Sequence, residues 1–292
     1  MADFARAVVN YFTSRNQSVP KVQGRYSIQS TRVDKRDVEA FMQLFYERPS
    51  TQVGNGEVAL FWLFGGMEGN VKSTGSGFAA DLQIGNANIE VKAYNSDNVK
   101  IGRFQRQTEF LQLVNTLFSV YNLVNDKNEV FSVFSFNYES LTRAAEEFCL
   151  IRQSLNEILN KLDTIERNTF MKIKIFKGIL ERAKSFDEFA KKLGINEICF
   201  IPGQGRPGGE LIAATLLKFV TEATLLEKPG GSTGYMAIMP ERFNETSQIE
   251  FIKVIENGRI NLSESKILNI HEYVSFSSGA MFINFKKLFG SY

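Results

Sequence analysis

The feature that most constrains the fold of this chain is a segment, residues 77–93, in which two short apolar runs flank a turn sequence. The runs are Ala80–Ile84 and Ile89–Ala93, and residues 85–88 between them read Gly-Asn-Ala-Asn. Apolar runs of this length, joined by glycine and asparagine, are typical of a β-hairpin. We therefore expect two antiparallel strands here.

Charged residues interrupt both apolar runs. Asp81 lies near the start of the first expected strand, and Glu90 and Lys92 lie on the second. Because alternate residues of a strand point to the same face, Glu90 and Lys92 project together, and the hairpin brings Asp81 beside them. Three charged groups are thus expected to converge at one end of the hairpin, with the core face formed by Ile89, Val91 and Ala93.

Phosphodiester hydrolysis would explain charged groups in such a place. The carboxylates of Asp81 and Glu90 and the backbone carbonyl of Val91 are hard oxygen ligands suited to Mg²⁺, for which Mn²⁺ can substitute. A bound metal polarises a phosphate and activates a water, and Lys92 could orient that water and stabilise the developing charge. The alternative is a surface hairpin with a cross-strand salt bridge, which leaves unexplained why charges interrupt apolar strands.

The scarcity of histidine and cysteine narrows the possible chemistry. The chain has one histidine, His271, and two cysteines, Cys149 and Cys199. This composition argues against HNH and HUH nucleases, zinc hydrolases and Ser-His-Asp catalysis. We expect a structural role for His271 and buried, reduced thiols at both cysteines. Catalysis would then rest on carboxylates and lysine.

At these residues the sequence resembles the PD-(D/E)XK nuclease superfamily, which includes restriction endonucleases, junction resolvases and many phage nucleases. Asp81 matches the motif aspartate and Glu90–Lys92 its (D/E)XK half, whereas Ala80 stands where the name implies proline. The resemblance covers roughly residues 50–137. It implies a Mg²⁺-dependent DNA endonuclease in which Asp81, Glu90 and Lys92 are catalytic.

A fourth carboxylate follows from the same resemblance. The family often places an acidic residue on a helix before the hairpin, and Glu57, in the apolar stretch GEVALF, fits that place. Glu57 is therefore expected to be a catalytic or metal-site carboxylate. The other expected metal ligands are the carboxylates of Asp81 and Glu90 and the backbone carbonyl of Val91.

Four basic residues are candidates for DNA contact. The net charge of +2 is small, so positive charge would have to be concentrated locally. We expect the phosphate contacts to come from Lys72, Lys100, Arg103 and Arg106. Arg103 and Arg106 would share one face of a helix, and the alternative for them is a solvated helix start.

The order of expected elements predicts an α/β fold. The expected helices are 3–12, 34–47, 57–64, 101–123, 141–166, 186–193 and 210–227, and further strands are expected at 129–137, 198–201, 235–239 and 250–255, with a hairpin at 272–285. The resemblance implies a restriction-endonuclease-like core with a mixed central β-sheet flanked by helices, within residues 1–170. Residues 171–292 would form a C-terminal α+β region that positions DNA or mediates dimerisation.

Two other functions remain open. The chain could be a non-catalytic DNA-binding or phage structural protein that retains a nuclease-like fold, although intact acidic residues argue against this. It could also bind a nucleotide through residues 203–208, which match GxGxxG, although Pro207 is unusual there. A structural loop, or a loop touching DNA phosphate, are the other interpretations of that segment.

The sequence also suggests a location and partners. The apolar run from Val58 to Met67 is about half the length that spans a bilayer. We therefore expect a cytoplasmic protein that does not associate with a membrane. A phage-encoded or virion-associated protein is a second expectation. The expected partner is double-stranded DNA. A homodimer is attractive because cutting both strands needs two sites.

Overall fold

The computed structural model describes most of the chain outside the segment between helices α5 and α7. The described residues are 4–29, 31–47, 54–73, 80–94, 97–103, 105–125, 127–129, 137–162, 208–226, 234–240 and 243–290, with single positions at 178, 181, 184, 188 and 191. The chain divides into two compact units, Met1–Ile101 with Glu222–Leu262 and Phe282–Tyr292, and Gly102–Thr221 with Ser263–Met281. These bounds differ from the expected division into 1–170 and 171–292.

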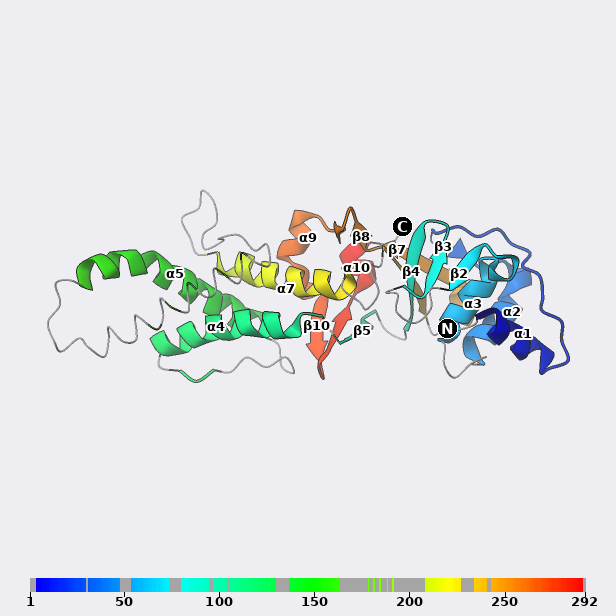
Figure 1. Ribbon diagram of the computed structural model, residues 1–292, viewed down its shortest axis with the longest axis horizontal. Helices are drawn as coiled ribbons and strands as arrows, with labels where there is room; N and C mark the ends of the chain where they lie inside the picture. The colour runs from blue at the N-terminus through cyan, green and yellow to red at the C-terminus, as the bar shows by residue number, and fades with distance from the viewer. Residues whose placement is uncertain are drawn as a thin grey trace. The chain divides into compact units, whose positions relative to one another are not determined.

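A six-stranded mixed sheet forms the centre of the first unit (Figure 1). Its order is β1-β7-β6-β4-β3-β2, where β4 and β6 run parallel and the other neighbours are antiparallel. The strands are β1 (Thr31–Arg32), β2 (Val71–Ser73), β3 (Leu82–Ile84), β4 (Ala87–Tyr94), β6 (Tyr235–Pro240) and β7 (Gln248–Lys253). The expected α/β class with a mixed central sheet flanked by helices is thus confirmed.

Three N-terminal helices form one core with a single face of this sheet: α1 (Phe4–Thr13), α2 (Lys35–Tyr46) and α3 (Asn55–Leu63). Helix α3 is buried almost all round because six consecutive apolar side chains follow its first turn. The sheet side chains in this core lie at alternate positions and include Leu82, Ile89, Val91, Ala237, Met239, Ile249 and Phe251. The hairpin's predicted core face is therefore confirmed for Ile89 and Val91.

Glycine at position 56 lets α3 approach the sheet closely. A Cβ atom there would lie 2.2 Å from the Met239 Cε atom and 3.0 Å from the Val91 Cγ1 atom. A larger residue would displace the flexible end of the Met239 side chain and press on the Val91 side chain of β4. This close approach fixes the helix turn that carries Glu57.

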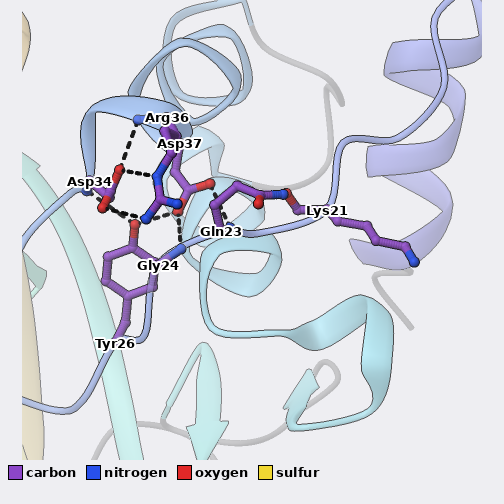
Figure 2. Close-up of polar contacts among 7 residues, drawn as sticks. All are labelled: Lys21, Gln23, Gly24, Tyr26, Asp34, Arg36 and Asp37. Atoms are coloured by element: carbon purple, nitrogen blue, oxygen red, sulfur yellow. Dashed lines mark hydrogen bonds and ion pairs between the residues drawn. The ribbon is translucent and has the colours of Figure 1, made fainter.

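A buried carboxylate fastens the N-terminal segment to helix α2. Asp37 is 1% exposed, and its two oxygens accept hydrogen bonds from the backbone N–H groups of Gln23 and Gly24 and from the hydroxyl of Tyr26, at 2.6–2.8 Å. Figure 2 shows these groups turned toward Asp37. Burial and the bond to Asp37 raise the pKa of Tyr26. The contacts fix residues 23–26 against the start of α2.

The second unit is mainly helical. Its long helices are α4 (Gln107–Asn125), α5 (Tyr138–Leu162) and most of α7 (Gly209–Leu226). Aromatic stacking joins α5 to the short helix η3 (Ile270–Glu272), because the rings of Tyr138 and His271 lie 3.9 Å apart and nearly parallel. The structure thus places His271 in a packing contact, as expected for a structural histidine, and Cys149 on α5 is buried and unbridged.

Shorter elements complete the described chain. They are a three-stranded sheet of order β10-β11-β5, from β5 (Val99–Arg103), β10 (Val274–Ser277) and β11 (Ala280–Ile283), a small hairpin of β8 (Ile255–Glu256) and β9 (Arg259–Ile260), and η1 (Gly66–Glu68), α8 (Phe243–Thr246), α9 (Glu264–Leu268) and α10 (Phe285–Phe289). The predicted C-terminal hairpin is confirmed by β10 and β11. None of the helices described combines the length and the apolar character that crossing a bilayer requires.

Two local predictions were wrong. Residues 101–103, expected to begin a helix, belong to strand β5, because exposed Lys100 separates buried Val99 and Ile101 and Gly102 has φ +98°, which no helix accommodates. Helix α4 begins at Gln107 instead. Strand β2, which pairs with β3, lies after η1 in a glycine-rich stretch where no strand was expected.

Other expected elements lie mostly outside the described residues: the strand 129–137, the helix 186–193, the strand 198–201 and the loop 203–208.

Candidate active site

Asp81 directly precedes the first residue of strand β3, at the end of its ladder with β4. Its backbone N–H donates to the carbonyl of Ile89 at 2.9 Å, and its Oδ2 atom accepts from the backbone N–H of Val91 at 2.8 Å. The carboxylate thus takes the acceptor position that the backbone of a continuing strand would supply. The last residues of β4 extend past this point alongside β6. Asp81 therefore lies directly beside the strand that bears Glu90 and Lys92.

Glu90 and Lys92 project from the same face of β4 and bind each other. The Lys92 Nζ atom donates to the Glu90 Oε1 atom at 2.5 Å. The side chain of Glu90 is 7% exposed and that of Lys92 is 24% exposed. The pair lies within one strand, and Glu90 is buried, so the alternative of a cross-strand salt bridge on the surface does not describe it.

The surrounding carboxylates hold Lys92 in its charged form. Burial alone would lower the pKa of the ammonium group. The charge and hydrogen bond of Glu90 outweigh this, and the charges of Asp81 and Glu57 add to the effect, so that the pKa of Lys92 is raised. A lysine fixed as a cation suits the stabilisation of negative charge and does not suit a general base.

Glu57, in the first turn of α3, belongs electrostatically to the same cluster. Its carboxylate folds back onto the helix start, since a Cβ atom on Gly54 would lie 2.5 Å from the Glu57 Oε1 atom. Burial first, then the negative charges of Asp81 and Glu90, raise the pKa of Glu57 to about 7 against the opposing effects of Gly54 and Lys92. The structure thus brings all four sequence-predicted side chains, Glu57, Asp81, Glu90 and Lys92, into one electrostatically coupled group.

The raised pKa of Glu57 predicts a pH-dependent stability. The folded chain binds a proton at Glu57 between the ordinary pKa of 4.5 and about 7. The stabilisation by this group is complete below pH 4.5 and is lost as pH rises through 7, which amounts to roughly 3 kcal/mol of unfolding free energy. Urea unfolding at pH 5 and pH 8 should show a smaller loss in Glu57→Gln than in the wild type. Glu39→Gln, on the exposed side of α2, is the control and should retain the wild-type slope; equal slopes in all three proteins would contradict the prediction.

A divalent cation would be held by one or two carboxylates of this group. Among the described residues, no three or more of His, Cys, Asp and Glu are placed together as a ready-made metal cage. Mg²⁺ usually binds through one or two carboxylates, with waters and substrate phosphate completing the shell. The mutual repulsion that raises the pKa of Glu57 marks a surplus of negative charge beside Asp81 and Glu90, which such an ion would offset.

The predicted DNA contacts do not form one set. Lys72 on β2 and Lys100 on β5 are exposed and belong to the first unit, whereas Arg103 and Arg106 belong to the second. The prediction that the two arginines share a helix face was wrong, because Arg103 ends strand β5 and Arg106 precedes α4 with φ +52°. The Arg106 guanidinium lies over the ring of Phe219, 5.9 Å from its centroid.

Sequence reasoning missed a second lysine–carboxylate pair on the same sheet face. Glu250 on β7 aligns with Lys92 through Ile238 of β6, so its side chain shares their face. Lys286 on α10 binds it at 2.8 Å. No local motif marks these residues, because the pairing of β6 with β4 and β7 joins distant parts of the chain.

No family model, no curated protein and no solved structure with which the chain was compared matches it. The geometry of Asp81, Glu90 and Lys92 is therefore the ground on which a function can be assigned.

Proposed function

We propose that this chain is a metal-dependent endodeoxyribonuclease of the PD-(D/E)XK type, which hydrolyses phosphodiester bonds of DNA. The observation that carries the proposal is the meeting of two carboxylates, Asp81 and Glu90, with the cationic Lys92 at the start of β3 beside β4. Acidic groups and a lysine at one sheet end suit phosphate chemistry that needs no histidine.

Part of the expected order of elements supports the proposal. A helix (α3) precedes the hairpin β3–β4. The helix expected at 101–123 is present from Gln107 as α4, and the strand expected after it, 129–137, lies mostly outside the described residues. The parallel neighbour of β4 is β6, which follows much later in the chain. Helix α3 contributes Glu57 and the hairpin contributes the other three side chains.

The residues divide the proposed work between them. Asp81 and Glu90 would hold Mg²⁺ or Mn²⁺, with the Val91 carbonyl as a further oxygen ligand and Glu57 as a supporting carboxylate whose charge acts on them. When bound, the ion supplies polarisation of the scissile phosphate and a water of lowered pKa. Lys92 orients the water and stabilises charge on the phosphate, which requires its bond to Glu90 to open as substrate enters.

Exposed basic residues are proposed to contact the DNA phosphates. Lys72 and Lys100 in the first unit and Arg103 and Arg106 in the second are the candidates for phosphate contact. Cutting both strands of a duplex requires two sites, which a homodimer would supply.

Cleavage of plasmid and linear DNA tests the proposal. Wild-type protein should cut with Mg²⁺ or Mn²⁺ and not with EDTA, and Asp81→Asn should lose at least 100-fold in rate. Asp34→Asn is the matched control, since Asp34 is an exposed carboxylate at the start of α2 and asparagine caps a helix equally well. In addition, Mg²⁺ should raise the melting temperature of wild type and of Asp34→Asn but not of Asp81→Asn.

Duplex, single-stranded and branched DNA should all be tried. Folded wild-type protein that cuts none of them, and that Mg²⁺ does not stabilise, would refute the nuclease assignment. Binding of DNA in that case would favour a non-catalytic DNA-binding or phage structural protein.

A further inference from the structure

The first unit contains a cavity separate from the proposed active site. Its volume is about 640 Å³, within the range of small-molecule sites. Tyr235, Phe251 and Lys253 line it from the sheet. These three residues share the sheet face of Ile89 and Val91, and therefore lie on the opposite face from Glu90 and Lys92.

The sheet supplies the cavity with an aromatic ring beside a cation. Tyr235 on β6 and Lys253 on β7 are direct cross-strand partners, so their side chains leave the sheet as nearest neighbours. The Phe251 side chain, 2% exposed, closes the inner wall. A planar aromatic ligand can stack on such a wall while an attached anion meets the ammonium group.

Polar groups surround the remaining sides. Gln29, Glu256 and Asn261 line the cavity with two amides and a carboxylate. Asn261 is fixed in place, because its backbone N–H donates to the Val254 carbonyl at 2.9 Å and its side-chain amide donates to the Lys253 carbonyl at 3.2 Å. Amides and a carboxylate together offer both donors and acceptors, which the edge of a nucleobase requires.

We propose that this cavity binds a single nucleotide, with the base against Tyr235 and the phosphate at Lys253. The ligand is either a free nucleoside monophosphate or an unpaired nucleotide of a nucleic-acid strand, since both present the same base and phosphate. Lys253 binds Glu256. When the nucleotide binds, the ammonium group of Lys253 exchanges the carboxylate of Glu256 for the phosphate. The proposal does not depend on nuclease activity and uses none of the residues 203–208.

Isothermal titration calorimetry in EDTA tests the site without cleavage. The probes are the four common nucleoside 5′-monophosphates, the corresponding nucleosides, a single-stranded tetranucleotide and a short duplex. Saturable binding is expected for at least one monophosphate or for the tetranucleotide, and not for the duplex. Tighter binding of the tetranucleotide would identify an unpaired strand as the ligand, and tighter binding of a monophosphate would identify the free nucleotide.

Two variants distinguish the contribution of the base to binding from that of the phosphate. Tyr235→Leu should weaken the nucleotide and its nucleoside at least tenfold, because a leucine fills space without stacking. Lys253→Gln should weaken the nucleotide about fivefold or more and leave the nucleoside unchanged. Tyr94→Leu and Lys286→Gln are the controls, since both residues belong to the same unit, do not line the cavity, and Lys286 also binds a glutamate.

Lys253 is one-third exposed, so its replacement by glutamine should not prevent folding. Absence of saturable binding at 10 mM ligand by every probe overturns the proposal, and so does binding that Tyr235→Leu and Lys253→Gln leave at wild-type affinity. Wild-type protein that binds the nucleotide but does not cleave DNA would refute only the nuclease assignment and not the nucleotide site.

Discussion

Replacement of Lys92 with alanine is expected to slow DNA cleavage by 10²- to 10³-fold at saturating substrate. Lys92 is the cation that binds Glu90 and whose pKa the charges of Glu90, Asp81 and Glu57 raise against burial. Its proposed task is to stabilise charge that develops on phosphate, and loss of one such preorganised group typically costs this much in kcat. Single-turnover cleavage of a labelled duplex measures the change.

The control for Lys92→Ala must also break a lysine–carboxylate pair. Lys286→Ala does so on the same sheet face, because Lys286 binds Glu250 as Lys92 binds Glu90. Both variants should lose stability, since each leaves a carboxylate without its partner, and Lys92→Ala should lose more because Glu90 is the more buried. The cleavage rate should collapse in Lys92→Ala alone. Equal losses of rate in the two variants at a temperature where both are folded would assign Lys92 a structural role.

Replacement of Asp37 with alanine is expected to destabilise the first unit by roughly 2–4 kcal/mol, because three partly buried donors lose their acceptor at once. The backbone N–H groups of Gln23 and Gly24 and the hydroxyl of Tyr26 all donate to this carboxylate. Urea unfolding followed by far-UV circular dichroism measures the loss. Asp37→Asn should lie between wild type and Asp37→Ala, since one acceptor oxygen remains.

Asp34→Ala is the matched control for Asp37. Both aspartates stand at the start of α2, but Asp34 is more exposed and bonds to the neighbouring Arg36 (Figure 2). Its hydrogen bonds with Arg36 hold the pKa of Asp34 near 2, so the charge persists at all ordinary pH values. A much smaller loss of stability is expected for Asp34→Ala. A loss as large as that of Asp37→Ala would show that helix capping, rather than the tether to residues 23–26, is what matters.

The hydrogen bonds that join Asp37 to residues 23–26 also connect the stability of the first unit with the proposed nucleotide site. Ile28 and Gln29, which line the cavity, follow directly on the segment that Asp37 fixes. Hydrogen exchange in Asp37→Ala should therefore accelerate at Gln23 and Gly24 before the sheet exchanges.

The hairpin and its charged face were predictable because their signals are local. Alternation along β4, glycine and asparagine at the turn, and charges in apolar strands all lie within residues 77–93. The same local information failed at Ile101, where a helical interpretation overlooked Gly102 and the burial alternation of β5. Strand β2 was not predicted, because three strand residues inside a glycine-rich stretch are too few to show a periodic pattern.

The remaining parts depend on contacts between distant residues. The parallel partner of β4 was expected as a strand but could not be assigned to it, because periodicity does not specify which strands pair. The burial of Asp37 follows from the path of residues 23–26, which no local sequence pattern predicts. The cavity likewise combines β6, β7 and the small hairpin with residues near position 28.

The pairing of β4 with β6 also decides when the site can exist during synthesis of the chain. Strand β6 begins about 140 residues after β4 ends, which takes a ribosome roughly 7–30 seconds at 5–20 residues per second. Until then β4 lacks the neighbour that supports the strand bearing Glu90 and Lys92. A chain released before residue 235 would carry the whole motif without the sheet that holds it. The proposed nuclease activity therefore requires synthesis to have passed strand β6.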